Sequence, residues 1–429
     1  GAPGPLGAGH RGGRVTVEEL CAAAKRAARS LATLPRERKD GALREVAEAL
    51  ERRADEILRE NAEDLKLART EHLPEVLVDR LLLDEDRLRD MAASVRAVMA
   101  LEDPVGRVTR GWRLPNGLEV RKQRVPFGVV AVVYEARPNV TVDAAVLCLK
   151  TGNAVVLRGG RAAKHSNRIL AEVVQGAVIE AGLPAEAVSY LPTERDMLLE
   201  LLQQRGTVDL IIPRGGEDLK DFLLEHSRVP VIYAAGGNCH VYVDAAADLE
   251  KALRIVVNAK VQRPGVCNAA ETLLVHTAVA GEFLPRAVKE LGARGVELVV
   301  DKATADIVHD PSLKRANRTH YETEFLSLKL AVRVVDSVDE AVEHIATYGT
   351  GHSEAIVTED LEAARRFTQL VDAACVYVNA STRFTDGGEF GLGAEIGIST
   401  QKLHARGPLA LEELTCEKYV VWGEGQVRG

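Results

Sequence analysis

The spacing of hydrophobic and polar positions changes character along the chain. Residues 16–100 have the pattern of helices with charged outer faces, and Thr16 followed by Glu19 predicts a capping box at the first helix. In residues 105–125, hydrophobic and polar positions alternate on either side of Asn116-Gly117, which predicts a β-hairpin. Polar residues occupy both faces of this hairpin, so we expect it to pair with a further strand or subunit.

From residue 128 onward, short apolar runs typical of strands alternate with longer helical runs. This alternation predicts parallel sheets with helices on both faces, an architecture that binds ligands at the carboxyl ends of its strands. A second series begins after Asp244, which predicts a second α/β domain of comparable size. The expected strands are 128–135, 153–157, 188–191, 208–212 and 229–234 in the first series, and 272–275, 296–300, 328–335, 355–357 and 374–378 in the second.

These patterns predict seven segments. The tail returns to strand-like alternation after Thr415, so we expect it to pair with the hairpin. The polar, glycine-rich stretch within residues 379–412 is too long for a simple linker. Because long loops in compact domains are usually functional, we expect it to contribute to the site. The segments are 1–13 (an unordered leader or tag remnant), 14–104 (helices of the first domain), 105–125 (hairpin), 126–246 (first α/β domain), 247–378 (second α/β domain), 379–412 (site loops returning to the first domain) and 413–429 (C-terminal strand).

Composition narrows the class of protein. The chain has 429 residues, of which 46% are hydrophobic and 28% charged, as in ordinary globular proteins. Its net charge of -8, without a basic stripe, argues against nucleic acid or an anionic membrane as partner. No apolar run reaches the roughly 18 residues of a spanning helix, so we expect a soluble, cytoplasmic protein. The six cysteines lack metal-site spacing, which predicts reduced thiols, no disulfide framework and no bound metal.

One cysteine lies in an unusual context. A cysteine that serves packing usually sits within an apolar helix or strand, whereas Cys267 follows the turn-forming residues Pro264 and Gly265. The thiol is therefore either a nucleophile placed to meet a ligand or a cysteine that happens to lie in a loop. The run Pro213-Arg214-Gly215-Gly216 ends a predicted strand and opens a helix, so it either binds an anion through free amides or forms only a tight turn.

Further contiguous motifs read Pro-Phe-Gly-Val-Val, Tyr-Glu-Ala-Arg-Pro-Asn-Val-Thr, Arg-Pro-Gly-Val-Cys-Asn, Asn-Ala-Ser-Thr-Arg-Phe and His-Ala-Arg-Gly-Pro, at 126–130, 134–141, 263–268, 379–384 and 404–408. In these motifs, and over nearly all of the chain from about residue 15, the sequence resembles the γ-glutamyl phosphate reductases of the aldehyde dehydrogenase superfamily. The resemblance implies an NADP-binding domain, a catalytic domain and a small β oligomerisation element. It also implies the second step of proline biosynthesis from glutamate.

The resemblance implies a mechanism for the cysteine. The Cys267 thiolate would attack the γ-carbonyl of γ-glutamyl phosphate and expel phosphate, and NADPH would reduce the resulting thioester to glutamate 5-semialdehyde. The amide of Cys267 and the side chain of Asn139 would stabilise the oxyanion, although Asn139 also fits a simple turn residue after Pro138. Hydrolytic relatives carry a glutamate base before Gly236-Gly237. Here the segment 233–235 reads Tyr-Ala-Ala, which suits a reductase that must protect its thioester from water, although many reductases of the family read Glu-Thr-Gly there.

The resemblance also suggests binding residues. Glu324 and Phe325 resemble the pair that holds the nicotinamide ribose, with a surface glutamate and a core phenylalanine as the alternative. Cations after a predicted strand suit the 2′-phosphate of NADP, although each could be surface charge. Guanidinium groups and hydroxyls suit the phosphate and carboxylates of the substrate. The cofactor candidates are Arg158, Gly159, Arg161, Lys164, Pro213, Arg214, Gly215, Gly216, Glu324 and Phe325; the substrate candidates are Arg137, Ser381, Thr382 and Arg383, with Arg406 and His404 as weaker choices.

Other functions stay open on the sequence alone. Another acyl-phosphate or acyl-CoA reductase, or an aldehyde dehydrogenase of the same fold, would share most of these features. A scaffold without activity is disfavoured because Cys267, Asn139 and Glu324 are all present. We expect a homodimer or homotetramer, with functional coupling to a glutamate 5-kinase that supplies the substrate.

Overall fold

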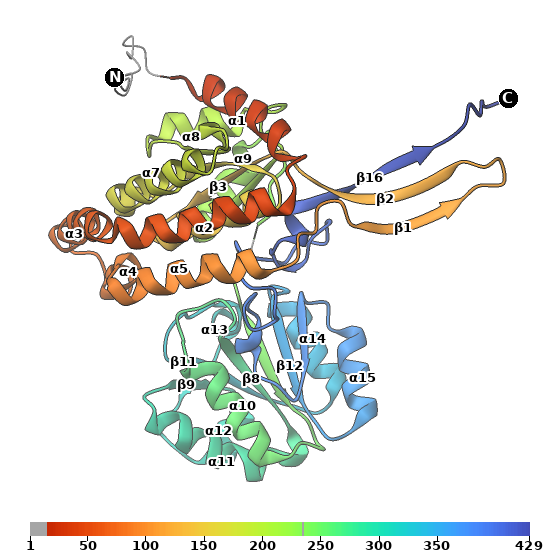
Figure 1. Cartoon of the computed structure of the whole chain (residues 1–429). Helices are drawn as coiled ribbons and strands as arrows, with labels where there is room; N and C mark the ends of the chain where they lie inside the picture. Colours follow the sequence, from red (N-terminus) through yellow and green to blue (C-terminus); the bar gives the residue numbers. More distant parts are fainter. Residues whose placement is uncertain (1–14, 234–235) are drawn as a thin grey trace, which may run out of the picture. The chain divides into compact units, whose positions relative to one another are not determined.

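The computed structural model of the chain describes residues 15–233 and 236–429 (Figure 1). The predicted leader 1–13 lies outside the described residues. The chain divides into two compact units. The first comprises residues 1–99, 125–211 and 223–231, and the second comprises 100–124, 212–222 and 232–429.

The first unit is built on a parallel sheet with the strand order β5-β4-β3-β6. Every residue of the central strand β3 is buried, because helices cover both faces of the sheet. The predicted capping box forms at the start of α1, where Thr16 and Glu19 each bond the backbone amide of the other. The strands are β3 (Val129–Tyr134), β4 (Ala154–Arg158), β5 (Val188–Tyr190) and β6 (Leu210–Arg214). The helices are α1 (Val17–Leu31), α2 (Arg36–Arg52), α3 (Ala54–Thr70), α4 (Glu75–Leu81), α5 (Glu85–Ala100), α6 (Asn139–Lys150), α7 (Lys164–Glu180), α8 (Arg195–Leu202) and α9 (Glu217–His226). Residues 212–214 of β6 and residues 217–222 of α9 are grouped with the second unit.

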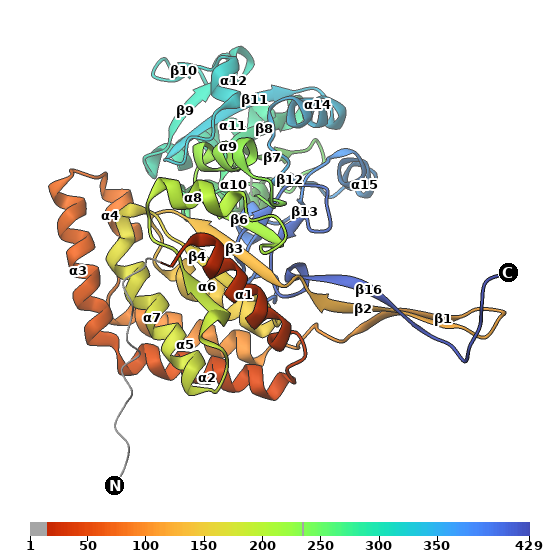
Figure 2. The same ribbon diagram turned by 90° about the horizontal axis from the view of Figure 1, so that it is seen from above.

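A separate three-stranded sheet contains the predicted hairpin and the C-terminal strand, in the order β1-β2-β16. Strands β1 (Val108–Arg113) and β2 (Glu119–Pro126) pair antiparallel across a turn in which Gly117 has a φ of 90°. Strand β16 (Thr415–Trp422) lies beside β2, as Figures 1 and 2 both show. The predicted pairing of the hairpin with the tail is therefore confirmed.

The second unit contains a seven-stranded sheet in the order β10-β9-β11-β8-β7-β12-β13, with every pair parallel. One apolar cluster packs α10 and α11 on one face, and a second packs α14 and α15 on the other. The strands are β7 (Cys239–Val243), β8 (Ala270–His276), β9 (Glu297–Val300), β10 (Lys314–Arg315), β11 (Lys329–Val335), β12 (Ser353–Val357) and β13 (Cys375–Val378). The helices are α10 (Leu249–Val261), α11 (Thr277–Ala293), α12 (Lys302–Val308), α13 (Arg318–Glu322), α14 (Val338–Tyr348) and α15 (Leu361–Leu370).

Two details differ from the sequence predictions. Strand β7 belongs to the seven-stranded sheet, although its residues fall in the range 126–246 that was predicted as the first α/β domain. It pairs with β8 and β12, a choice of partners that its own apolar pattern does not encode. The strand predicted at 229–234 is reduced to one bridge between Ile211 and Val231, since Pro230 has no amide hydrogen to offer a ladder. Within the described ranges, no helix is long and apolar enough to cross a membrane.

Candidate active site

Cys267 lies on the turn that joins the end of α10 to the start of β8. The backbone turns here through a hydrogen bond from the amide of Ala269 to the carbonyl of Val266, at 3.1 Å. Cys267 is partly exposed, whereas Cys21, Cys148, Cys239 and Cys375 are buried and Cys416 lies on an exposed strand. All six are free cysteines in the structure. The sequence-predicted nucleophile therefore occupies an accessible turn.

The segment that leads into β7 holds the backbone of this turn. Gly237 packs so tightly that a Cβ atom there would overlap the carbonyl oxygen of Cys267. The thiol of Cys239 donates a hydrogen bond to the same oxygen at 3.2 Å. Burial raises the pKa of Cys239 well above its ordinary value, so this group stays a thiol and a donor. Two neighbouring central strands thus fix the position of the nucleophile.

A buried ion pair ties the two ends of the turn together. Lys260, in the last turn of α10, contacts Glu271 of β8 at 2.6 Å, and both side chains are fully buried. Burial lowers the pKa of Lys260 and raises that of Glu271 to about 7, while the opposite charge of each partner counteracts the shift. The other oxygen of Glu271 accepts the amide of Leu326 at 3.1 Å. The pair therefore also supports the loop that carries Glu324 and Phe325.

Glu324 and Phe325 lie in this loop, next to the cysteine. One oxygen of Glu324 accepts the amide of Gly237 at 2.7 Å, so a single glycine borders both Glu324 and Cys267. Burial raises the pKa of Glu324, and the Gly237 amide counteracts the rise. The structure thus brings the predicted ribose-binding pair and the predicted nucleophile together.

The segment after β13 packs against the Cys267 turn through Asn268. The hydroxyl of Thr382 donates to the carbonyl of Asn268 at 2.7 Å, and the side-chain amide of Asn268 donates to the carbonyl of Thr385 at 2.8 Å. Ser381 caps the short 3₁₀ helix Thr382–Phe384 by accepting the amide of Arg383. Of the three predicted substrate residues in this segment, Ser381 and Thr382 use their hydroxyls within the fold, and Arg383 donates hydrogen bonds to the side chains of Gln262 and Asn268.

The predicted anion turn also occurs in the structure. Strand β6 ends at Arg214, and α9 begins at Glu217, so Pro213, Gly215 and Gly216 lie at or after a strand end as expected. Arg214 lies close to a carboxyl group that sequence reasoning missed, Glu395, whose side chain accepts the amide of Gly387 at 2.9 Å. Burial raises the pKa of Glu395 to about 7, and the charge of Arg214 opposes the rise. An acidic residue in the glycine-rich loop was the signal that could have identified it.

His352 is a second residue that the sequence did not single out. It is buried at the start of β12, and its Nδ1 atom lies 2.8 Å from Ser353 Oγ and 3.9 Å from Cys239 Sγ. Burial lowers its pKa to about 4, although Glu324, Glu354 and Glu395 oppose the shift. His352 is therefore a neutral part of the packing beneath the turn.

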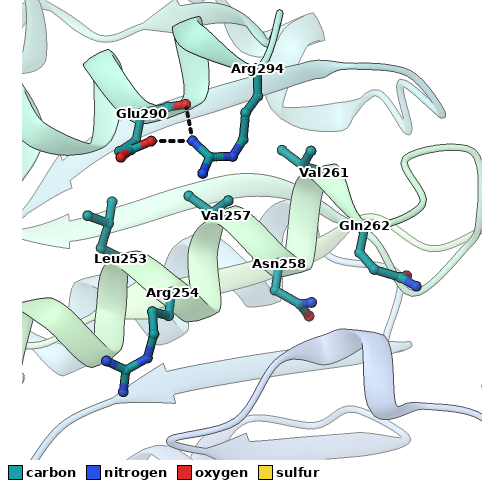
Figure 3. A pocket seen from close by; sticks show the side chains of 8 residues that line it. All are labelled: Leu253, Arg254, Val257, Asn258, Val261, Gln262, Glu290 and Arg294. Carbon is teal, nitrogen blue, oxygen red and sulfur yellow. Dashed lines mark hydrogen bonds and ion pairs between the residues drawn. The ribbon is translucent and has the colours of Figure 1, made fainter.

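In the second unit, these groups gather at the amino ends of parallel strands. Cys267 precedes β8, Gly237 precedes β7, and His352 precedes β12. The candidate residues of this unit therefore lie at the opposite ends of the strands from those expected for ligand binding. A groove of about 420 Å³ lies between α10 and α11 and extends to Gln262 (Figure 3). Cys267 does not line this groove.

The cofactor candidates of the first unit do lie at a carboxyl end, after β4. Arg158 ends the strand and donates to the carbonyl of Thr193 at 2.7 Å. A Cβ atom at Gly159 would collide with the side chain of Asn167, which would have to shift. Arg161 and Lys164 are exposed around the start of α7, with Glu71 within 3.5 Å of Arg161. An accessible pair of cations at a strand end, beside a crowded glycine, fits a nucleotide phosphate.

The remaining candidates have local contacts. Asn139 begins α6 in the first unit and donates to Asp143 at 3.0 Å, and Arg137 lies in the turn before that helix. In the second unit, His404 contacts the carbonyl of Glu413 at 3.1 Å and Arg406 pairs with Asp372 at 2.8 Å. His404 and Arg406 therefore both have polar partners within the second unit. The proposed functional roles of Asn139 and Arg137 stay predictions.

A parallel α/β unit that holds an accessible cysteine between two central strands, with a second parallel sheet in the other unit, defines a class of protein. The sequence model described as "Aldehyde dehydrogenase family" matches residues 4–324. The chain belongs to the aldehyde dehydrogenase family, and within it to the γ-glutamyl phosphate reductases.

Three relatives support this assignment. The γ-glutamyl phosphate reductase of Thermobifida fusca (strain YX) is 54% identical over 413 residues, which cover 96% of this chain and 98% of the relative. That of Syntrophomonas wolfei is 53% identical over 406 residues, which cover 94% of this chain and 96% of the relative. The crystal structure of γ-glutamyl phosphate reductase from Thermotoga maritima has a TM-score of 0.93 at 46% identity, covering 96% of this chain and all of that one. The predicted fold class and family are confirmed.

Proposed function

We propose that this protein reduces γ-glutamyl 5-phosphate to glutamate 5-semialdehyde with release of phosphate, the second step of proline synthesis from glutamate. The observation that carries the proposal is Cys267, partly exposed on a turn whose backbone is fixed by Gly237 and Cys239. The identity to γ-glutamyl phosphate reductases along almost the whole chain supports this substrate over other acyl groups.

The chain supplies the nucleophile and its surroundings. The Cys267 thiolate forms a C–S bond to the γ-carbonyl carbon, and the C–O bond to phosphate breaks, with the electron pair leaving on phosphate. The amide of Cys267 stabilises the intermediate oxyanion, and Asn139 is the proposed second donor. Phosphate leaves readily without a proton, so positioning matters more than acid catalysis. In the second unit, Glu324 is bound to the Gly237 amide, which makes it a poor base for activating water against the thioester.

The residues fit a nicotinamide dinucleotide, and NADPH, when bound, supplies the hydride that reduces the thioester. Glu324 and Phe325 are proposed to hold the nicotinamide ribose. Arg158, Gly159, Arg161 and Lys164 are proposed to bind the adenosine end, with the exposed Arg161 and Lys164 favouring a 2′-phosphate. The backbone of Pro213–Gly216 and the side chain of Arg214 are proposed for the pyrophosphate region. Arg137, Ser381, Thr382 and Arg383 are proposed for the substrate.

We also propose that the protein assembles with copies of itself through the β1-β2-β16 sheet. This sheet exposes four large apolar side chains, those of Trp112, Tyr419, Val421 and Trp422. The rings of Trp112 and Tyr419 pack edge to face with their centres 6.3 Å apart. Exposed aromatic residues on a small sheet with open edges are suited to a second copy of the chain. Because an acyl phosphate is labile, a glutamate kinase that hands over its product directly is the proposed supplier.

The proposal is tested in the reverse direction, by NADPH formation from glutamate semialdehyde and NADP⁺ with and without phosphate. We expect the rate to require phosphate, and we expect Cys267→Ala to abolish turnover while still binding NADPH. Cys416→Ala, at an exposed cysteine, is the matched control. Activity that is unchanged without phosphate, or supported equally by coenzyme A, would contradict the assigned substrate. Undiminished turnover in Cys267→Ala would contradict the mechanism.

A further inference from the structure

The guanidinium group of Arg383 bridges the two ends of the turn that carries the nucleophile. Its Nε atom donates to Gln262 Oε1 at 2.8 Å, and its Nη1 atom donates to Asn268 Oδ1. Gln262 follows α10 directly and Asn268 is the neighbour of Cys267. Figure 3 shows Gln262 at the end of α10. The guanidinium plane is therefore held in a defined orientation across the turn.

The hydrogen-bond partners of Arg383 are neutral, whereas several other arginines of the described residues pair with carboxylates. Elsewhere, for example, Arg366 pairs with Asp339 and Arg333 pairs with Glu340. Among the described residues, neither Arg383 nor the exposed Arg263 forms an ion pair with a carboxylate. Two amide oxygens orient the guanidinium of Arg383 without forming an ion pair with it.

Arg263 adds a second positive charge at the same place. It follows Gln262 in the chain. Burial lowers the pKa of Arg383, and the charge of Arg263 lowers it further, while electrostatic interactions with Cys267, Asp386 and Glu389 raise it. Two like charges held together cost free energy unless an anion joins them, and this pair adjoins the attacking thiol.

We propose that Arg263 and Arg383 form the subsite for the phosphate group of the substrate, with Gln262 and Asn268 orienting Arg383. This inference rests on the proposed function. In the forward direction, the C–O bond to phosphate breaks as the C–S bond to Cys267 forms, and both guanidinium groups stabilise the charge that develops on the departing phosphate. In the reverse direction, an oxygen of phosphate attacks the thioester carbonyl, the C–S bond breaks, and the Cys267 thiolate leaves.

The two arginines have different tasks. The planar guanidinium group of Arg383 has enough N–H donors to contact the side-chain oxygens of Gln262 and Asn268 and the ligand at the same time. The single ammonium group of lysine cannot reproduce this arrangement. Arg263 is exposed and acts mainly through its charge, so lysine is an adequate replacement. The subsite also explains a preference for acyl phosphates, because coenzyme A thioesters place no dianion next to the reacting carbonyl.

The test is the KM for phosphate in the reverse reaction. For Arg263→Gln we expect an increase of about ten-fold or more, with the KM for glutamate semialdehyde and NADP⁺ little changed. Arg263→Lys should regain most of the loss, whereas Arg383→Lys should not. Arg254→Gln, at an exposed arginine on α10, is the matched control and should leave the KM for phosphate unchanged.

A second readout uses no cofactor. Inorganic phosphate should slow alkylation of Cys267 by iodoacetamide in the wild-type protein, and it should do so less in Arg263→Gln. An unchanged KM for phosphate and unchanged protection in both Arg263→Gln and Arg383→Lys would overturn the subsite while leaving the proposed function intact. A wild-type reaction that needs no phosphate would overturn both. Because Arg263 is exposed, its variants keep the test decisive if Arg383 proves necessary for folding.

Discussion

At the scale of single residues, the position of the nucleophile depends on Gly237. This glycine leaves room for the carbonyl oxygen of Cys267 and donates its own amide to Glu324 at 2.7 Å. It therefore sets the spacing between the attacking thiol and the proposed ribose-binding carboxylate. Its φ angle is not positive, so the requirement for glycine arises from crowding and not from backbone conformation.

We predict that Gly237→Ala lowers kcat on the order of 100-fold, because the added methyl group must displace the Cys267 carbonyl and a shift of about 1 Å in a reacting group has that effect. Gly281→Ala in α11 is the matched control, since a Cβ atom there meets nothing within 4 Å. Steady-state kinetics and the alkylation rate of Cys267 give the comparison. A wild-type kcat in Gly237→Ala would show that the turn adapts to the methyl group.

Glu395 should make stability depend on pH. Its ordinary pKa of 4.5 rises to about 7 in the folded chain, so the folded state binds the proton more tightly than the unfolded state. The resulting stabilisation is complete below pH 4.5 and is lost as the pH rises through 7; at about 1.4 kcal/mol per pKa unit it amounts to roughly 3 kcal/mol.

The measurement is the free energy of unfolding of wild type and Glu395→Gln at about pH 5 and about pH 8. Relative to the wild type, the variant should gain stability as the pH rises across this interval. Glu389→Gln, an exposed carboxylate in the same loop, is the matched control. A difference between Glu395→Gln and wild type that is equal at both pH values would refute the titration.

At the scale of elements, the sequence was informative wherever local chemistry decides the outcome. The capping box at Thr16 and the Asn-Gly hairpin occur where the pattern predicts them, since each depends on residues close together in the chain. The placement of β7 in the seven-stranded sheet could not be predicted, because a buried apolar strand is compatible with either sheet.

The residues that position the candidate active site could not be predicted from the sequence either. Asn268 joins the Cys267 turn to a segment that lies more than a hundred residues further along, and Lys260 meets Glu271 only because α10 and β8 pack together. These contacts depend on tertiary packing, to which no local pattern corresponds. The resemblance supplied the nucleophile and the candidate ligands of the site. The residues that position them came from the structure.

The Lys260–Glu271 pair permits a test of how α10 and β8 are joined. Lys260→Met and Glu271→Gln should each lower the free energy of unfolding by about 3–5 kcal/mol, because each leaves an uncompensated buried charge. The double variant should recover much of this loss, and its glutamine can still accept the Leu326 amide. Urea denaturation of the three variants gives the coupling energy.

An exposed ion pair provides the reference for that measurement. Asp339→Asn removes the partner of Arg366, and both of these side chains are more than half exposed. It should cost less than about 1 kcal/mol. A double variant no more stable than the single variants would mean that the Lys260–Glu271 pair itself stabilises the fold.

At the scale of the whole molecule, we predict that the β1-β2-β16 sheet governs assembly. Replacing Trp112 and Tyr419 together with serine removes apolar contact area and should shift the protein to smaller species in sedimentation velocity. Leu361→Ser, at an apolar residue that is 63% exposed on α15, is the matched control and should leave the sedimentation coefficient unchanged. An unaltered distribution for the double variant would place the interface elsewhere.

The site of the second unit has an electrostatic consequence that follows from its place at the amino ends of the strands. The helix that leads into the Cys267 turn, α10, ends there, so the negative end of its dipole faces the turn. Many reactive cysteines gain their anionic form from a helix amino terminus, and this cysteine has the opposite field from α10. Positive side chains such as Arg263 and Arg383 can instead supply charge that balances a thiolate here. The arginines proposed to bind the phosphate, Arg263 and Arg383, would then also stabilise the thiolate form of Cys267. A bound anion would neutralise their charge and so reduce this stabilisation.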